Sequence, residues 1–131
     1  MGKKRAEGRL KFHVKLQKAD RLKNNYIGIQ MNKEENEKRL ARLKNIVLSM
    51  PEQPGSYQYY DRDGVIIYVG KAKNLKRRVS SYFHKEVDRF KTKVLVSKIW
   101  DISYTVVNSE EDALLLENSL IKQYNPRYNV L

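Results

Sequence analysis

The stretch "YQYYDRDGVIIYVG", residues 57–70, has the pattern of a β-hairpin, because two runs of aromatic and β-branched residues flank a short polar turn. If Asp61 and Gly64 close this turn, the register places Tyr57 directly opposite Tyr68. Both side chains then lie on one face of the sheet, with their Cβ atoms about 5 Å apart. A bulge would shift this pairing by one residue. Two facing phenols are compatible with core packing or with a catalytic role, and other residues of the chain are needed to distinguish the two.

Outside this hairpin, whose strands we expect over 56–60 and 65–69, the apolar pattern predicts further elements. They are helices over 32–49, 75–83, 90–100 and 110–124 and a third strand over 101–108. Asn74 is placed to cap the second helix, and Ser109 followed by Asp112 resembles a capping box before the last one. The order favours an α+β fold in which a small three-stranded antiparallel sheet is flanked by helices.

The composition restricts the classes of function. The 131 residues suffice for one small domain, and 27 Lys and Arg against 15 Asp and Glu give a net charge of +12, which favours a polyanionic partner. The absence of cysteine excludes disulfides and thiol catalysis, and two histidines are too few for a histidine-rich metal site. No run approaches the roughly 18 apolar residues of a membrane span. We therefore expect a cytoplasmic protein without a membrane partner.

The positive charge is concentrated at the N-terminus. Nine Lys and Arg against two acidic residues give residues 1–30 a net charge of +7, and this segment has only weak hydrophobic periodicity. Met31 then opens a stretch that resembles a new protein start. We expect 1–30 to be a basic leader or an artificially added segment, partly disordered, and 31–131 to be the functional domain. A native basic arm that binds nucleic acid is the competing interpretation.

Glu117 occupies an unusual position in the last predicted helix. Its neighbours three and four residues away are all apolar, namely Ala113, Leu114, Leu120 and Ile121. A carboxylate in a buried stripe costs several kcal/mol unless it is paired or bound to a cation. One interpretation is a structural ion pair or an edge position that reaches water. The other is a lone carboxylate ligand for a hard cation such as Mg²⁺, which keeps several waters and needs few protein ligands.

A basic run follows the second strand of the hairpin. It contains Lys71, Lys73, Lys76, Arg77 and Arg78, without an acidic residue among them. A solvated helix face explains such a run, but Arg78 and Tyr82 are also i,i+4 neighbours on the same helix. A guanidinium beside a phenol suits a phosphate group. Gly70, just before the run, allows close approach of the backbone to a ligand or a sharp turn into the helix.

Four segments together resemble the GIY-YIG nuclease domain. They are "GSY" (55–57), "YVG" (68–70), "KAKNLKRRVSSYF" (71–83) and "LLLENSLIKQYNPRYNVL" (114–131). More narrowly, they resemble its UvrC-type members, the N-terminal domains of the incision subunit of bacterial nucleotide excision repair. The resemblance covers residues 40–131, and each three-residue motif departs from the family name only at its middle position.

The resemblance implies a role for each matching residue. The implied catalytic residues are Tyr57, Tyr68, Lys71, Arg78, Tyr82 and Asn129. The implied ligand of a single Mg²⁺ or Mn²⁺ ion is Glu117. The basic residues implied in nucleic-acid binding are Lys71, Lys73, Lys76, Arg77 and Arg78. The implied structural glycines are Gly55 and Gly70.

The implied reaction is metal-dependent hydrolysis of a DNA phosphodiester 3′ to a lesion, with damaged double-stranded DNA as substrate and UvrB as partner of the full-length protein. Tyr68 is the best candidate for the general base, and Tyr57 is the alternative. A phenol has a pKa near 10, so a cation such as Lys71 or metal-bound solvent has to lower it. The alternatives are a basic DNA- or RNA-binding module without cleavage, and a stand-alone or homing GIY-YIG endonuclease.

Overall fold

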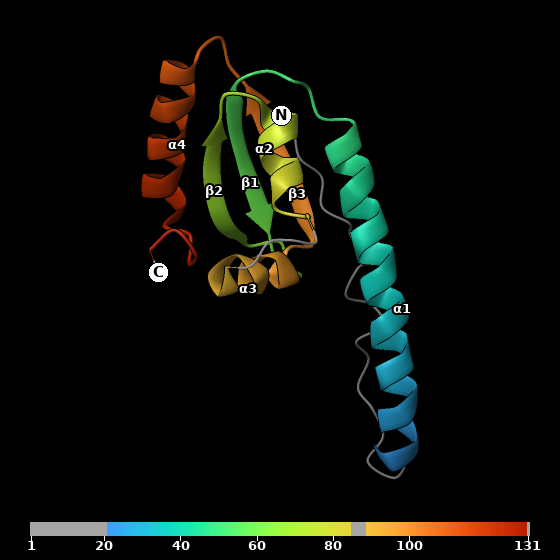
Figure 1. Ribbon diagram of the computed structural model, residues 1–131. Helices are drawn as coiled ribbons and strands as arrows, with labels where there is room; N and C mark the ends of the chain where they lie inside the picture. Colours follow the sequence, from blue (N-terminus) through green and yellow to red (C-terminus); the bar gives the residue numbers. More distant parts are fainter. Residues whose placement is uncertain (1–20, 85–88, 131) are drawn as a thin grey trace.

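A computed structural model describes residues 21–84 and 89–130, with side chains from residue 32 onward (Figure 1). The elements in chain order are α1 (Arg21–Leu48), β1 (Gly55–Tyr60), β2 (Ile66–Ala72), α2 (Leu75–Ser81), α3 (Phe90–Lys98), β3 (Asp101–Val106) and α4 (Glu110–Tyr124). The predicted order of helices and strands is therefore confirmed. The main differences are at the ends, because α2, α3 and β3 each end two residues earlier than expected.

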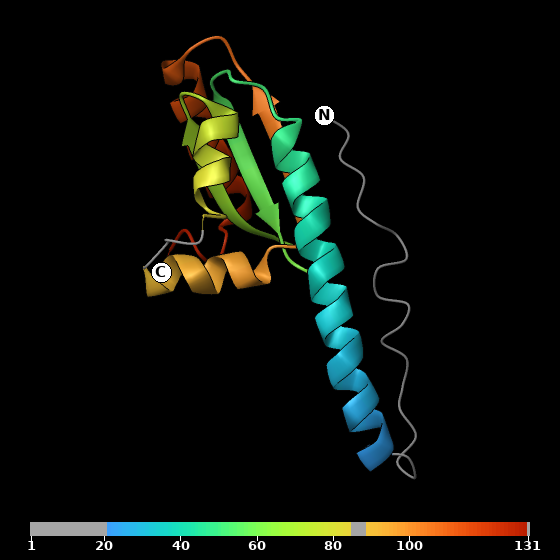
Figure 2. The ribbon, with the colours of Figure 1, turned by 45° about the vertical axis from the view of Figure 1, so that its right-hand side comes forward.

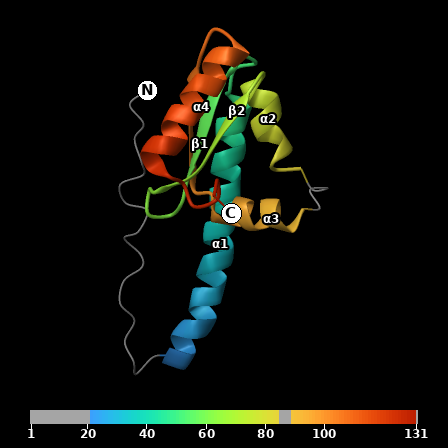
Figure 3. The same ribbon diagram turned by 90° about the vertical axis from the view of Figure 1, so that its left-hand side faces the viewer.

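The three strands form one antiparallel sheet in the order β2-β1-β3, so β1 is the central strand. Helix α4 covers one face of this sheet, and α1 and α2 lie over the other (Figures 1 and 3). Helix α3 crosses below the end of the sheet. The predicted α+β class with a small antiparallel sheet flanked by helices is confirmed.

The register of the hairpin differs from the expected one. Tyr57 pairs with Gly70 and Tyr59 pairs with Tyr68, and the ladder is irregular between Tyr59 and Tyr60. The expected direct pairing of Tyr57 with Tyr68 is therefore wrong. An offset of two residues leaves every side chain on its original face, because the side-chain period of a strand is two. Tyr57 and Tyr68 consequently share a face, as expected, but as diagonal neighbours.

The predicted capping residues occupy the positions that the sequence assigns to them. The Asn74 side chain accepts a hydrogen bond from the Arg77 backbone N–H at 3.0 Å and begins α2. The Ser109 side chain accepts one from the backbone N–H of Asp112 at 3.1 Å and begins α4. Helix α4 ends at Asn125, whose φ of 44° is the left-handed conformation typical of a helix end. Polar side chains therefore define both helix starts.

Helix α1 begins at Arg21 and not at residue 32, so it runs across the expected boundary at residue 31. Its first part extends beyond the rest of the domain (Figure 2). Its second part is attached by Leu43, which is fully buried, and by Arg39, which donates to the carbonyl of Ile99. The expected partial disorder concerns residues 1–30, of which 1–20 lie outside the described residues, and the domain boundary stays a prediction.

The core lies between the sheet and the layer formed by α1, α2 and α3. Its fully buried members are Tyr59, Leu43, Leu75, Val79 and Ile99. They come from β1 and from the faces of α1 and α2 and the end of α3. Within the part of the chain that the structure describes, no helix has the length and apolar character to cross a membrane.

Candidate active site

A groove of about 660 Å³ opens beside the edge strand β2. Its walls come from β2, the last turn of α2, the first part of α3 and the segment after α4. The residues that line it are Tyr68, Arg78, Ser81, Tyr82, Arg89, Lys91, Thr92, Leu95, Tyr128 and Asn129. Four of these, Tyr68, Arg78, Tyr82 and Asn129, are residues that the sequence analysis implies to be catalytic. The fold therefore brings them to one concave surface.

Hydrogen bonds join two tyrosines and an arginine beside this groove. The hydroxyls of Tyr57 and Tyr82 lie 2.7 Å apart, and Arg78 donates to the Tyr82 hydroxyl at 3.3 Å. The Arg78 guanidinium also lies 5.0 Å from the centre of the Tyr82 ring. The i,i+4 pairing expected of Arg78 and Tyr82 is thus present, and it orients one forked cationic donor and one hydroxyl at the groove.

Gly70 allows Tyr57 to reach this position. A Cβ atom at residue 70 would lie 2.2 Å from Cζ of the Tyr57 ring, so the ring passes directly over the backbone of β2. On the other face of the sheet, Ser56 donates to the Gly70 carbonyl at 2.8 Å and fixes this part of the strand. Gly55 is equally constrained, because a Cβ there would lie 2.3 Å from the carbonyl oxygen of Thr105.

Burial raises the pKa of the tyrosines at the site. Tyr57 is 1% exposed, and desolvation raises its pKa to about 12 although the Tyr82 hydrogen bond opposes the shift. Desolvation is also the main cause of the raised pKa of Tyr68, and the positive charge of Arg78 opposes it. Arg78 is thus one cation that opposes the raised pKa of the Tyr68 phenol, and the expected effect of Lys71 or of metal-bound solvent on this phenol stays a prediction.

Tyr59 completes the aromatic cluster and was not expected from the sequence as a site residue. Its ring centre lies 5.2 Å from that of Tyr57 and from that of Tyr82, and 5.9 Å from that of Tyr68. Tyr59 is fully buried, and its hydroxyl has no hydrogen-bond partner among the described residues. Its position two residues after Tyr57 on the same strand face is the signal that identifies it as a neighbour.

We expect Tyr59→Phe to raise the free energy of unfolding by up to about 1 kcal/mol, because it removes a buried hydroxyl that lacks a partner among the described residues. Thermal and denaturant unfolding measure the effect. Tyr57→Phe is the matched comparison, and we expect it to lower stability by about 1 kcal/mol because it breaks the hydrogen bond to Tyr82. A clear loss of stability in Tyr59→Phe would contradict this interpretation and assign a role to its hydroxyl.

Glu117 projects from α4 toward the edge strand β2 and is half-buried. The expectation of a fully buried apolar stripe around it is wrong in part, because its neighbour Leu114 is 43% exposed. Partial burial raises the pKa of the Glu117 carboxyl, and the positive charge of Lys71 opposes this shift. The Glu117 charge in turn helps to raise the pKa of Tyr68. Glu117, Lys71 and Tyr68 therefore form one electrostatic group.

The donor set at this position fits a hard divalent cation. The Glu117 carboxylate accepts no hydrogen bond and forms no ion pair within 4.0 Å among residues 32–84 and 89–130. In the same ranges, no group of three His, Cys, Asp or Glu side chains comes together. A single carboxylate oxygen donor with solvent beside it suits Mg²⁺, which binds through one or two carboxylates and keeps several waters.

Asn129 holds the segment after α4 against β2. Its side-chain oxygen accepts from the backbone N–H of Val69 at 2.8 Å, and its side-chain nitrogen donates to the Val69 carbonyl at 2.9 Å. The backbone N–H of Tyr128 donates to the carbonyl of Ile67 at 2.9 Å. Both the oxygen and the nitrogen of the Asn129 side-chain amide are thus hydrogen-bonded to the backbone of the residue between Tyr68 and Gly70. Asn129 therefore fixes the backbone of β2 next to Tyr68.

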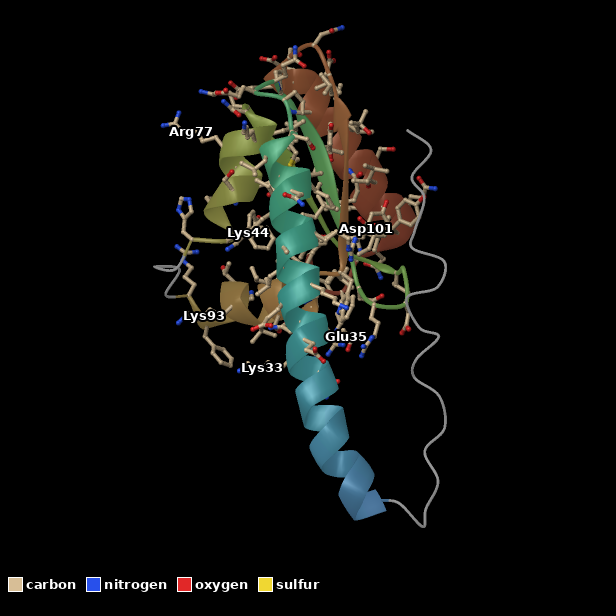
Figure 4. The ribbon with its side chains drawn as sticks, turned by 90° about the vertical axis from the view of Figure 1, so that its right-hand side faces the viewer. Lys33, Glu35, Lys44, Arg77, Lys93 and Asp101 are labelled. Carbon is tan, nitrogen blue, oxygen red and sulfur yellow. The ribbon has the colours of Figure 1, made fainter. Side chains whose placement is uncertain are left out.

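The other basic residues of the run do not line the groove. Lys73 is highly exposed and pairs with Glu110 at 3.4 Å. Lys76 and Arg77 lie on α2 outside the groove lining, and Figure 4 shows Arg77 extending outward from the helix. The structure therefore separates Arg78 from the basic residues that precede it on α2.

Comparisons with known proteins agree with this geometry. A model of the UvrC-like GIY-YIG domain family matches residues 53–130. Among solved structures, the GIY-YIG N-terminal endonuclease domain of UvrC from Thermotoga maritima, bound to its catalytic magnesium, is 36% identical with a TM-score of 0.61. That match covers 66% of this chain and 94% of the Thermotoga domain.

Two curated relatives are more similar in sequence. UvrABC system protein C from Bacteroides fragilis is 73% identical over 89 residues, which are 68% of this chain. The Bacteroides thetaiotaomicron protein of the same name is 65% identical over 101 residues, or 77% of this chain. The chain spans only 15% and 17% of the length of these two relatives.

Proposed function

The chain belongs to the UvrC-like GIY-YIG domain family, and we propose that it is a metal-dependent endonuclease domain that hydrolyses a DNA phosphodiester during nucleotide excision repair. The observation that carries this proposal is the half-buried Glu117 carboxylate, which has no ion pair within 4.0 Å among the described side chains and stands in electrostatic contact with Tyr68. The phenol of Tyr68 and the cationic Arg78 line one groove, and the proposed cation ligand Glu117 lies outside its lining but acts electrostatically on Tyr68.

In the proposed mechanism, Tyr68 is the general base that takes a proton from the attacking water at its phenol oxygen. Tyr68 lines the groove, whereas Tyr57 is 1% exposed and its hydroxyl contacts Tyr82. This difference in exposure favours Tyr68 for the base and gives Tyr57 the role of a positioning residue. Arg78 and the Tyr82 hydroxyl donate to the phosphate and neutralise the charge that develops on it.

Glu117 would hold the divalent cation, which we propose to be one Mg²⁺ or Mn²⁺ ion. When bound, such a cation supplies a Lewis acid for a phosphate oxygen and for the leaving 3′ oxygen. The positive charge of Lys71 opposes the rise of the Glu117 carboxyl pKa and so favours the ionised form that binds a cation. Asn129 keeps Tyr68 in position through the backbone of Val69.

The similarity to UvrABC system protein C supports our proposals for the partners of the domain. We propose damaged double-stranded DNA as the substrate, incision 3′ to the lesion, UvrB as the partner of the full-length protein, and the cytoplasm as its location. The basic residues Lys73, Lys76 and Arg77 are proposed as peripheral contacts to DNA, whereas Arg78 acts at the scissile phosphate. Since the matched relatives are much longer than this chain, we expect damage recognition to come from outside it.

Metal removal tests the proposal. We expect EDTA to abolish incision 3′ to a defined lesion by a full-length UvrC carrying this domain, in the presence of UvrB, because no other group replaces the Lewis acid. Adding Mg²⁺ or Mn²⁺ in excess should restore the cut, which denaturing gel electrophoresis of end-labelled DNA measures. Metal-independent, salt-sensitive binding without any product would instead indicate a DNA-binding module.

A further inference from the structure

One wall of the groove is not explained by the catalytic group. The groove-lining residues with proposed chemical roles lie on β2, at the end of α2 and in the segment after α4, but another part of the lining comes from the start of α3. It contributes Arg89, directly before the helix, and Lys91, Thr92 and Leu95. The fold therefore adds further basic side chains to the groove that contains Arg78, at residues that lie outside the basic run recognised in the sequence.

The charge of the groove is of one sign. Among its described lining residues the charged ones are Arg78, Arg89 and Lys91, and all three are basic. Arg89 and Lys91 are exposed, and the hydroxyl of Thr92 adds a neutral hydrogen-bonding group. A concave surface with one sign of charge attracts a polyanion, and guanidinium, ammonium and hydroxyl groups are the usual contacts to phosphate oxygens.

Other surfaces of the domain are less suited to the same ligand. The second large cavity, about 700 Å³ around Trp100, contains the acidic side chains Glu35, Asp61 and Asp63 together with basic ones. On α2, Lys76 and Arg77 lie outside the groove lining, and Arg77 extends outward. Among the described lining residues, the α3 side of the groove therefore combines basic side chains and concavity with Arg78 in the same groove.

We propose that the α3 wall binds the sugar-phosphate backbone of the cut DNA strand next to the scissile phosphate, with Arg89 and Lys91 as its phosphate contacts. This inference rests on the proposed function in one respect, which is that Arg78 marks the position of the scissile phosphate. It predicts that the strand runs across the groove from α2 to α3 and passes Tyr82 and Thr92. Arg89 and Lys91 then contribute to substrate binding and not to the chemical step.

The test compares two double variants of α3 that remove the same charge. Arg89→Ala/Lys91→Ala changes the groove wall, whereas Lys93→Ala/Lys98→Ala changes exposed residues of α3 outside the groove lining, of which Lys93 extends outward in Figure 4. Arg89 precedes the helix without a side-chain capping hydrogen bond, so its replacement leaves the helix start intact. Thermal unfolding of both variants checks that each is folded.

Binding is measured by fluorescence anisotropy of a labelled duplex over a series of salt concentrations, with EDTA present so that no DNA is cut. We expect the groove variant to reduce the slope of log Kd against log salt by about two and to weaken binding roughly tenfold or more at about 0.1 M salt. The control variant should keep the wild-type slope. Equal salt slopes in the wild type and both double variants, or an equal loss of DNA affinity in the two variants, would overturn the proposal.

This outcome is separable from that of the proposed function. The binding assay contains no metal and no cleavage step, so loss of binding in the groove variant alone supports the inference even if the domain proves unable to cut DNA. Conversely, metal-dependent incision by the wild type together with a groove variant that binds and cuts normally would overturn the inference and leave the nuclease assignment intact. In single-turnover incision, the inference requires a higher half-saturating protein concentration with an unchanged maximal rate.

Discussion

Replacing Glu117 with alanine is expected to abolish metal-dependent incision, with a loss of about a thousandfold or more in single-turnover rate, because the proposed ligand of the metal ion is removed. The same change should keep the fold, or even stabilise it, in the absence of metal. Burial raises the pKa of the Glu117 carboxyl, which means that the ionised form is less stable in the folded state than in the unfolded one.

The pH dependence of folding stability checks the sign of the effect of the Glu117 carboxyl. Because the folded pKa is raised, wild-type stability without metal should fall as pH increases through the Glu117 titration, and a variant without the carboxyl should not show this fall. Thermal unfolding in EDTA at acidic and neutral pH measures the difference. At neutral pH, Glu117→Gln should therefore be at least as stable as wild type, and the difference should disappear at acidic pH.

Two control variants distinguish a role of Glu117 in metal binding from a structural role. Glu117→Gln retains the shape of the side chain and separates the loss of charge from the loss of packing. Glu111→Ala removes an exposed carboxylate from the first turn of the same helix and should leave incision unchanged, with a loss of stability of about 0.5 kcal/mol from the helix N-terminus. A collapse of stability in both Glu117 variants would identify Glu117 as a structural residue, and undiminished incision would remove it from the metal site.

Replacing Tyr68 with phenylalanine is expected to reduce the rate of incision by about 10²- to 10⁴-fold while the domain stays folded, because the variant lacks the general base but keeps the ring. Tyr68 is half-buried in contact with the aromatic cluster, so the ring accounts for most of its packing. Single-turnover incision and thermal unfolding, measured on the same preparation, check both parts of the prediction.

The pH profile adds a second readout. Desolvation raises the pKa of the Tyr68 phenol, and Tyr82, Arg78 and Glu117 are the ionisable groups that act on it. Below this pKa the phenolate fraction increases up to tenfold per pH unit, so the wild-type rate should rise between about pH 7 and 9. The residual rate of Tyr68→Phe should lack this rise.

Matched phenylalanine variants separate the two candidate bases. Tyr57→Phe should lower the rate less than Tyr68→Phe, since the buried Tyr57 hydroxyl positions Tyr82. Tyr104→Phe, on the neighbouring strand β3 opposite Tyr57, should cut DNA at the wild-type rate. A full rate in Tyr68→Phe together with a large loss in Tyr57→Phe would transfer the base role to Tyr57.

Much of the fold follows from local sequence patterns. The alternation around the turn at Asp61 and the side-chain caps Asn74 and Ser109 depend on neighbouring residues, and these features are where the sequence places them. The register was not predictable in the same way. A shift of two residues preserves the alternation of faces, so the pattern that identifies β1 and β2 contains no information that separates Gly70 from Tyr68 as the partner of Tyr57.

For the site, the sequence allowed us to predict which residues belong to it, but not how the helices are placed around them. The helical spacing of Arg78 and Tyr82 specifies their contact, whereas the exposure of Leu114 depends on how α4 is rotated against the sheet. The start of α1 at Arg21 was missed because the residues before Met31 carry little hydrophobic periodicity. Arg89 and Lys91 reach the groove through the placement of α3, which no local pattern encodes.

The attachment of Tyr128 and Asn129 to β2 has a consequence beyond catalysis. Strand β2 lies at the border of the sheet, and an uncovered border strand offers its free backbone groups to a strand from another molecule. The hydrogen bonds from residues 128 and 129 occupy backbone groups of Ile67 and Val69 that would otherwise be open to such pairing. The same short segment that holds Tyr68 in place thus also protects the domain against self-association through this strand.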